Sequence, residues 1–250
     1  MKDNLTGKLF IGTSGIAVPG NKKNFPSEYH SKSRLNFYAA HLNSIEINST
    51  FYQTPMPVTF AKWALDVPED FKFTIKLSRQ ITHEKNLLFD LNTIDNFCNA
   101  AAALGDKKGM LLLQFPGKIS IGYFTQIEKI LEKFSRLLPQ NKWRTAIEFR
   151  NPDWYVSETA ELLDQYNSSM VLHDFSKAKN ITMPHKSRIV YLRFHGPAGN
   201  YRGSYTNDYL ALQADKIKEW VKAEKEVFVY FNNTMGEGWQ NALTLKALCQ

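Results

Sequence analysis

Hydrophobic and polar positions along this 250-residue chain change repeatedly between a period of two and a period near 3.6 residues. The period-two segments and short apolar runs predict eight strands. These are Leu9–Ile11, Ser44–Tyr52, Phe71–Leu77, Met110–Pro116, Trp143–Arg150, Met170–Asp174, Ile189–His195 and Val227–Phe231. The segments between them predict helices, at 33–42, 60–64, 94–104, 124–138, 157–166, 210–221 and 239–248. Pro139 is expected to end the fourth helix after Leu138, and Ser157 is expected to be the N-cap of the next.

Eight strands alternating with helices within 250 residues favour a closed, parallel, TIM-type (β/α)8 barrel formed by a single domain over residues 1–250. An open doubly wound sheet is the rival architecture. It normally opens a helix with a glycine fingerprint directly after the first strand. The run Gly12-Thr13-Ser14-Gly15 lacks that spacing, and a long proline-containing loop follows it.

Composition narrows the class of protein only a little. The formal net charge is +7, with no basic tail or block, so it indicates a mild preference for anionic partners. Cys98 and Cys249 are far apart, fit no metal-binding spacing and are interpreted as reduced packing residues. With no apolar stretch typical of a signal peptide or membrane span, we expect a cytoplasmic protein. The sequence leaves the cofactor and the oligomeric state open.

Polar residues gather at the carboxyl ends of the predicted strands, where barrels of this class carry their sites. Residues i and i+2 of a strand share one face. Four such pairs occur near strand ends: Glu46 with Asn48, Glu148 with Arg150, Arg193 with His195, and Tyr230 with Asn232. Any one pair can be a buried ion pair or polar contact that only holds the barrel together. Together they predict a ligand site at one end of the barrel.

Within this predicted site, Glu46 and Glu148 are the candidates for general acid and base, and His195 and Asp174 are the other candidate catalytic residues. Cationic, amide and aromatic side chains suit an anionic or polyhydroxylated ligand. The candidate ligand-binding residues are Asn48, Tyr52, Lys76, His83, Gln114, Arg150, Trp154, Arg193, Tyr201, Tyr230 and Asn232. No metal site is predicted, since a divalent-metal site of Glu46, Glu148, Asp174 and His195 has only a weak signal.

These residues leave more than one function open. The leading hypothesis is a protein that binds a small anionic or polyhydroxylated ligand, with a phosphate ester as one candidate, and uses carboxylate acid/base chemistry. The alternative is a nucleic-acid-binding or processing protein, favoured by the positive charge and the loop aromatics. A glycosidase that uses Glu46 and Glu148 is a third hypothesis. The sequence does not decide whether the site catalyses a reaction.

Nine short motifs, in this order along nearly the whole chain, resemble the YecE-like family, domain of unknown function 72. They are Gly12–Gly15, Ile45–Tyr52, Phe71–Lys76, Thr82-His83, Leu113–Pro116, Glu148–Arg150, Trp154, Arg193–Gly196 and Tyr230–Asn233. The resemblance implies a TIM-type barrel and no established activity. The family usually has a tryptophan after the first motif. This chain has Ile16 there, which leaves the contribution of the loop from Ile16 to Asn24 open.

Overall fold

The computed structural model describes residues 7–141, 143–180 and 186–250, so the first six residues, on which the expectation about a signal peptide rests, lie outside the described part. The eight strands form one parallel sheet in the order β1-β8-β7-β6-β5-β4-β3-β2. The strands are β1 (Lys8–Thr13), β2 (Ser44–Ile47), β3 (Lys72–Lys76), β4 (Lys108–Phe115), β5 (Thr145–Phe149), β6 (Ser169–His173), β7 (Ile189–Phe194) and β8 (Glu226–Phe231). The predicted TIM-type barrel is therefore confirmed.

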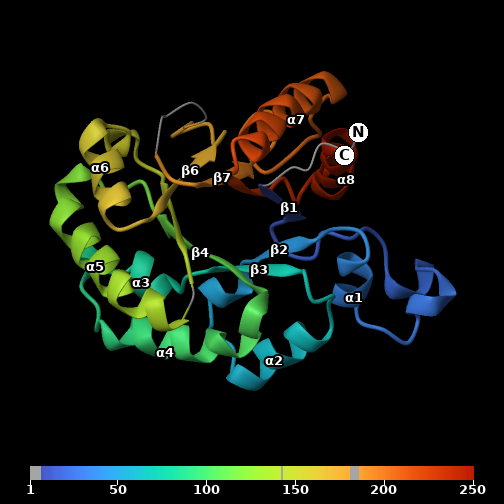
Figure 1. Cartoon of the computed structure of the whole chain (residues 1–250), viewed down its shortest axis with the longest axis horizontal. Coiled ribbons are helices and arrows are strands. Elements are labelled where there is room, and N and C mark those ends of the chain that lie inside the picture. Colours follow the sequence, from blue (N-terminus) through green and yellow to red (C-terminus); the bar gives the residue numbers. More distant parts are fainter. Residues whose placement is uncertain (1–6, 142, 181–185) are drawn as a thin grey trace.

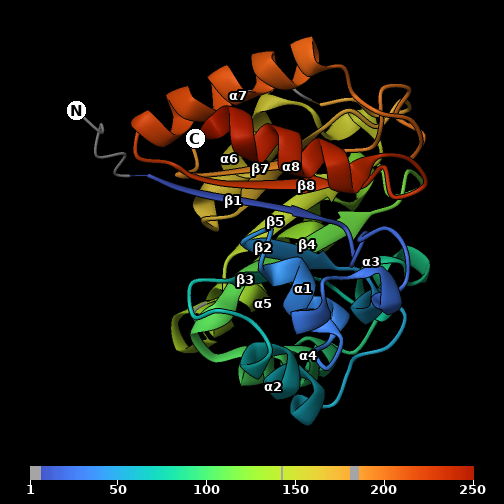
Figure 2. The same cartoon turned by 90° about the vertical axis from the view of Figure 1, so that its right-hand side faces the viewer.

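Helices surround this sheet on its outside, as Figure 1 shows. They are α1 (Arg34–Ala39), α2 (Pro57–Leu65), α3 (Arg79–Thr82), α4 (Asn92–Ala101), α5 (Phe124–Asn141), α6 (Ser157–Gln165), α7 (Asn207–Lys222) and α8 (Gly238–Cys249). The turned view in Figure 2 shows α7 and α8 lying along β1, β7 and β8. Helix α7 begins after Thr206, whose side chain accepts a hydrogen bond from the amide of Tyr209 at 3.3 Å.

Strand alternation divides the apolar residues into two groups. One face of each strand joins the large cluster between the sheet and the helices, which includes Ile45, Ile47 and Leu192. The other face looks into the barrel, where a second cluster is formed by Phe10, Met110, Leu112, Ala146, Val171, Tyr191, Phe228 and Tyr230. Because side chains alternate along a strand, the residues two positions further on point into the same interior, nearer its carboxyl end.

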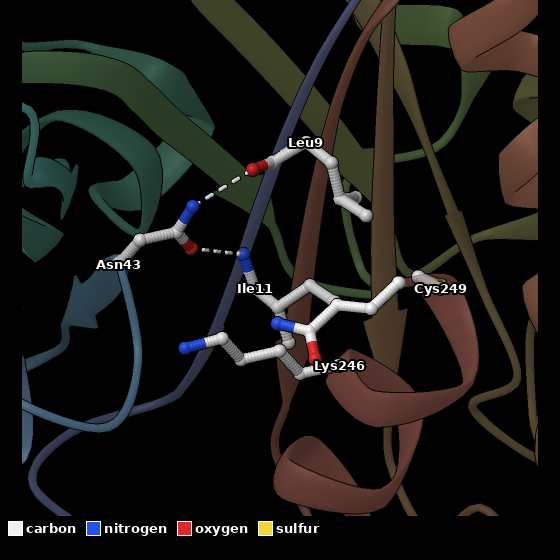
Figure 3. A pocket seen from close by; sticks show the side chains of 6 residues that line it. Leu9, Ile11, Asn43, Lys246 and Cys249 are labelled. Carbon is white, nitrogen blue, oxygen red and sulfur yellow. Dashed lines mark hydrogen bonds between the residues drawn. The ribbon is translucent and has the colours of Figure 1, made fainter. Parts of the chain in front are cut away.

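The barrel closes between β1 and β2 mostly through side chains. A single backbone bridge joins Ser14 to Glu46 outside the named strands. Nearer the amino ends, the Asn43 side chain accepts from the Ile11 amide at 2.9 Å and donates to the Leu9 carbonyl at 2.8 Å, as Figure 3 shows. A Cβ on Gly12 would lie 2.1 Å from the Ser44 carbonyl oxygen, so only glycine permits this approach.

The structure corrects several predicted boundaries. The second strand ends at Ile47 rather than Tyr52, and residues Ser49–Phe51 form a 3-10 helix. The Thr50 hydroxyl donates to the carbonyls of Ile47 and Lys76, which turns the chain away from the sheet. Ser157 is the first residue of α6 and not its N-cap, which is Val156. Helix α5 continues past Pro139 to Asn141. Near a helix end, proline costs only one of the last hydrogen bonds.

No helix in the described ranges is both long enough and apolar enough to cross a membrane.

Candidate functional site: an ion-pair network below a cationic pocket

Three strands place opposite charges in the barrel interior. Glu46 of β2, Glu148 of β5 and Arg193 of β7 are each almost fully buried, with exposed fractions of 0%, 0% and 1%. Their neighbours along each strand are apolar and pack outward against the helices. The alternation that builds the outer core therefore forces these charged residues inward, where only mutual pairing offsets the loss of hydration.

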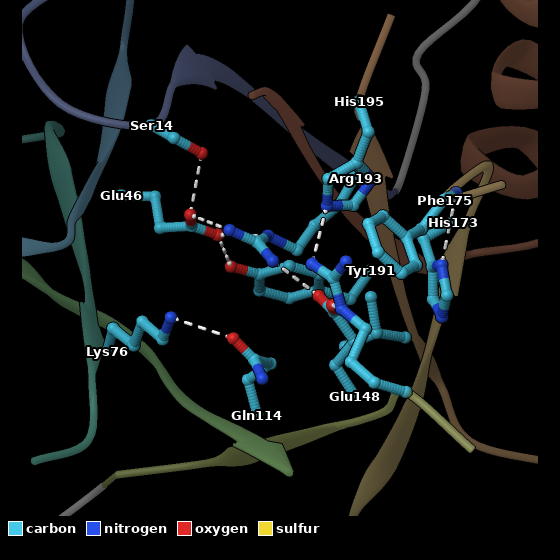
Figure 4. A network of polar contacts seen from close by, with 12 residues as sticks. Ser14, Glu46, Lys76, Gln114, Glu148, His173, Phe175, Tyr191, Arg193 and His195 are labelled. Atoms are coloured by element: carbon cyan, nitrogen blue, oxygen red, sulfur yellow. Dashed lines mark hydrogen bonds and ion pairs between the residues drawn. The ribbon is translucent and has the colours of Figure 1, made fainter. Parts of the chain in front are cut away.

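Arg193 connects the two carboxylates (Figure 4). Its Nε and Nη2 atoms donate to Glu46 Oε2 and Oε1 at 3.0 and 2.7 Å, and its Nη1 atom donates to Glu148 Oε2 at 2.5 Å. The Ser14 hydroxyl donates to Glu46 Oε1 and the Tyr191 hydroxyl donates to Oε2, each at 2.6 Å. Both oxygens of Glu46 thus accept two hydrogen bonds from buried donors.

Arg150 extends the network from Glu148 toward the loops. Its Nε donates to Glu148 Oε1, and its Nη1 donates to the Tyr201 hydroxyl at 3.2 Å. The centre of its guanidinium lies 3.8 Å from the centroid of the Phe175 ring, a cation–π contact. The guanidinium thus joins Glu148 to Phe175 and Tyr201, which lie in the loops after β6 and β7.

The surroundings of Glu46, Glu148 and Arg193 favour the ionised form of each side chain. Burial pushes the pKa of Glu148 upward, but Arg150 and Arg193 outweigh it and hold the pKa well below its usual range. Burial likewise opposes ionisation of Glu46, yet Arg193 lowers the pKa of this carboxyl. Burial disfavours the charge on Arg193, whereas Glu148 and Glu46 raise its pKa well above the usual value. Both carboxylates are therefore ionised and the arginine is charged at neutral pH.

His195 and Asp174 form a second polar group beside the network. Arg150 Nη2 donates to His195 Nε2 at 2.9 Å, so the neutral ring carries its proton on Nδ1, which lies 3.4 Å from Asp174 Oδ1. Burial lowers the pKa of His195, in keeping with the neutral form. Asp174 accepts hydrogen bonds from the His195 amide at 2.6 Å and from the Tyr205 hydroxyl. The Asp174 carboxylate thus forms its hydrogen bonds with residues that follow β7, and not with the barrel interior.

A pocket of about 180 Å3 opens above the ion pairs, at the carboxyl ends of the strands. Its lining residues are Asn48, Phe51, Tyr52, Lys76, Gln114, Arg150, Arg193, Tyr201 and Asn232. Three are cations and three are amides, while no carboxylate of the described residues lines it. The Oδ1 atom of Asn48 is buried and has no hydrogen-bond partner in the described structure. The pocket thus offers positive charge together with amide groups.

Besides Glu46, Glu148 and His195, described above, four more candidate site residues lie outside the lining of this pocket. Trp154 is fully buried, its ring stacks 4.3 Å from that of Phe149, and its Nε1 donates to the Ile119 carbonyl, so it cannot stack on a ligand. The Tyr230 hydroxyl bonds Ser44 and Thr74 deeper in the barrel. The others are Asp174, described above, and His83, whose ring packs edge-on against Phe51 at 4.7 Å. Burial and nearby cations lower the pKa of His83 to about 4.

The sequence reasoning missed residues that the network needs. Tyr191 shares a strand face with Arg193 and His195, so the period-two pattern was sufficient to include it. Phe175, which lies against Arg150, belongs to the loop after β6, and Phe51, which lies against Lys76, belongs to the 3-10 helix Ser49–Phe51, so neither had such a signal. Residues Gly15 and Ile16 of the unusual first loop line a separate, more apolar hollow of about 330 Å3 with Leu35 and Trp63.

The divalent-metal site considered above does not form. Within residues 7–141, 143–180 and 186–250 there is no group of three or more histidine, cysteine, aspartate or glutamate side chains that could hold a metal ion. Glu46 and Glu148 pair with arginines, whereas Asp174 pairs with Tyr205 and His195.

Fold and site together define a TIM-type barrel whose interior ends in a buried glutamate–arginine network below a cationic pocket. The family model described as "Protein of unknown function DUF72" matches residues 10–250. The chain therefore belongs to the DUF72 family.

Among its relatives, the UPF0759 protein YecE of Escherichia coli K12 is 25% identical over 160 residues, which cover 62% of this chain and 57% of YecE. The chain thus matches little more than half the length of that relative. A DUF72 family protein from Enterococcus faecalis V583 superposes with a TM-score of 0.79 at 21% identity, covering 96% of this chain and 95% of that one. The 3-keto-D-glucoside 4-epimerase YcjR of E. coli is more distant, with a TM-score of 0.55 at 10% identity and coverage of 97% and 98%. Likeness at these identities shows the fold alone.

Proposed function

We propose that this protein binds a small ligand with an anionic group and several hydroxyls in the pocket above the ion-pair network. The observation that carries the proposal is the lining of the pocket, which has three cations and no carboxylate among the described residues. Lys76, Arg150 and Arg193 carry three positive charges, and Glu46 and Glu148 below them carry two negative charges. The group therefore has a net charge of +1. The planar guanidinium of Arg150 is suited to bind phosphate or carboxylate.

Hydroxyl recognition is supported by the amides of the same pocket. Asn48 supplies an amide group that can form a hydrogen bond with a ligand hydroxyl. Gln114 and Asn232 supply further amide groups. At about 180 Å3 the pocket is smaller than the roughly 300–1,000 Å3 typical of drug-sized ligands, so a compact molecule is favoured.

In this proposal, Glu46 and Glu148 position the side chains of Arg150 and Arg193. Acid/base catalysis requires a carboxyl group that reaches the ligand and exchanges a proton. Neither glutamate lines the pocket, and both are held ionised by buried donors. The geometry therefore argues against the acid/base and glycosidase roles predicted for these two residues. A sugar-like ligand is in keeping with the epimerase that shares this fold, although that likeness carries no residue-level argument.

A direct test is a calorimetric titration with glycerol 3-phosphate, inorganic phosphate and glycerol. We expect binding of glycerol 3-phosphate, weaker binding of phosphate and none of glycerol. Arg150→Gln should weaken binding at least about tenfold, because a charge-assisted contact is lost. Arg144→Gln is the matched control, since Arg144 pairs with Glu226 and lies outside the pocket lining. Equal binding of glycerol and its phosphate, or unchanged affinity in Arg150→Gln, would overturn the proposal.

A cytoplasmic location forms part of this proposal, supported by the free cysteines Cys98 and Cys249. The nucleic-acid alternative stays a prediction of the sequence, and the small pocket gives it no added support. A fluorescence-anisotropy titration with a single-stranded oligonucleotide at low and moderate salt tests it, because binding to phosphates weakens steeply with salt.

A further inference from the structure

Lys76 differs from the other two cations of the pocket in its partners. Arg150 and Arg193 each donate to a buried carboxylate. The Nζ atom of Lys76 donates instead to the neutral amide oxygen of Gln114 at 2.8 Å and lies 4.2 Å from the centroid of the Phe51 ring. In the described part of the chain, Lys76 forms no ion pair. Figure 4 shows its side chain extending from β3 toward Gln114 and the network.

Charges of both signs surround this amine. Glu46 faces it from β2, Glu148 and Arg150 from the end of β5, and Arg193 from β7. Burial is the largest influence, and together with Arg193 it lowers the pKa of Lys76 to about 8 despite the two glutamates. At pH 7 about one Lys76 side chain in ten is then the neutral amine, roughly 300-fold more than for an ordinary lysine. Such a lysine combines two properties that nucleophilic amines require, access to a ligand pocket and ready loss of its proton.

We propose that Lys76 is a nucleophile that forms an imine with the carbonyl group of an anionic ligand, an aldehyde or ketone that carries a phosphate or a carboxylate. This inference rests on the proposed function, because Arg150 and Arg193 hold the anionic group while the carbonyl carbon meets Nζ. The Phe51 ring and the Gln114 oxygen contacting Nζ would stabilise the positive charge of the protonated imine.

The chemistry balances without an oxidant or reductant. The Nζ lone pair forms a bond to the carbonyl carbon, and the π electrons of that carbonyl become a lone pair on its oxygen. A proton moves from nitrogen to this oxygen and gives a carbinolamine. Protonation and departure of the hydroxyl as water then form the C=N bond of a protonated imine. Water reverses the sequence, so the amine is regenerated when the ligand leaves.

The anionic group of the ligand can be a phosphate or a carboxylate, and the experiment distinguishes the two. Wild-type protein is incubated at pH 7.5 with glycolaldehyde phosphate or with glyoxylate, each in the presence of sodium cyanoborohydride, which reduces an imine to a stable amine. Neutral glycolaldehyde is the control probe. Peptide mass spectrometry then gives the rate of labelling at every lysine, so the first readout needs no variant.

The internal control is Lys72, which lies on the same face of the same strand as Lys76 but outside the pocket, and whose Nζ donates to the Asp106 carbonyl at 2.5 Å. We expect Lys76 to be labelled at least about tenfold faster than Lys72 by one of the anionic probes, and much more slowly by neutral glycolaldehyde. The rate should rise with pH to a plateau above about 8. A Lys76→Arg variant that keeps the wild-type melting temperature should lose this label, and Lys72→Arg should keep it.

Labelling spread evenly over surface lysines, or Lys76 no faster than Lys72, would overturn the inference. This failure can be told from failure of the proposed function. If glycerol 3-phosphate binds and Arg150→Gln weakens it while Lys76 is not labelled, anion binding stands and the imine does not. Fast labelling of Lys76 by neutral glycolaldehyde as well would contradict the proposed selection for an anionic ligand.

Discussion

Arg193 and Glu46 lie 147 residues apart in the sequence and meet inside the barrel through two parallel hydrogen bonds. In the sheet order, β1 and β8 separate the strands that carry them, so the pair spans the interior rather than joining neighbouring strands. The same guanidinium also binds Glu148. One buried arginine thus ties three strands together below the pocket. This arrangement makes several properties of the protein testable.

Removing one carboxylate should destabilise the fold. Glu148→Gln leaves Arg193 and Arg150 with half of their compensating charge in a buried setting, and we expect a loss of roughly 3–5 kcal/mol in the free energy of unfolding. For a chain of this size, thermal melts should show a midpoint about 10 °C lower. Glu226→Gln is the control, because Glu226 and Arg144 are each 31% exposed, and should cost about 1 kcal/mol or less. A Glu148→Gln midpoint equal to or above the wild type would mean that the carboxylate is kept for function rather than stability.

The free energy of unfolding should decrease as the pH is lowered through the range where His173 titrates. Burial lowers the pKa of His173 to about 4. Its Nδ1 accepts from the Phe175 amide at 3.3 Å, which fits a neutral ring. The unfolded state, with a histidine pKa near 6.5, takes up the proton first, so this stability is full above about pH 6.5 and is lost as the pH falls toward 4. Denaturant unfolding at several pH values measures it. His173→Gln should reduce the slope of the curve between pH 6.5 and 4, where His83 and His195 also contribute, and an unchanged slope would contradict the assignment.

The seam between β1 and β2 should open locally when its side-chain clamp is removed. Asn43→Ala deletes the acceptor of the Ile11 amide and the donor to the Leu9 carbonyl, at a cost of roughly 1–3 kcal/mol. Hydrogen exchange should therefore become faster at the Ile11 amide. Asn151→Ala, which also removes one accepted and one donated bond but in an exposed loop, is the matched control and should leave that amide protected. Equal protection of Ile11 in both variants would show that the clamp contributes nothing.

The close approach at Gly12 gives a steric test of the same seam. A Cβ there would lie 2.1 Å from the Ser44 carbonyl oxygen and 2.9 Å from the Tyr38 hydroxyl, so β1 and β2 must separate in Gly12→Ala. We expect a loss of about 3 kcal/mol, seen as a lower midpoint in urea. At Gly122 an added Cβ would meet its nearest atom at 3.5 Å, so Gly122→Ala should change stability little. Similar midpoints for the two variants would show that the seam adjusts freely.

The sequence by itself determined the barrel and the direction of its charged residues. Period-two alternation places Ile45 and Ile47 on one face and Glu46 on the other, and the same holds around Glu148 and Arg193. Because an outward apolar face must pack against helices, the charged face can only look inward. The direction of a side chain along a strand does not depend on which residue it contacts. The strand count, the barrel and most pocket residues were therefore predictable.

Only the tertiary structure decided which charges meet and which side chains remain free for a ligand. Arg193 binds both glutamates because of the register of the eight strands and the length of its side chain. Local sequence does not encode this register. The same register gives each carboxylate oxygen of Glu46 two hydrogen bonds, which the sequence did not predict. Trp154 was misjudged because its environment comes from Phe149 and Phe124, contributed by other segments of the chain. Lys76 acquires its character in the same way, since burial and the charge of Arg193, contributed by a distant strand, lower its pKa.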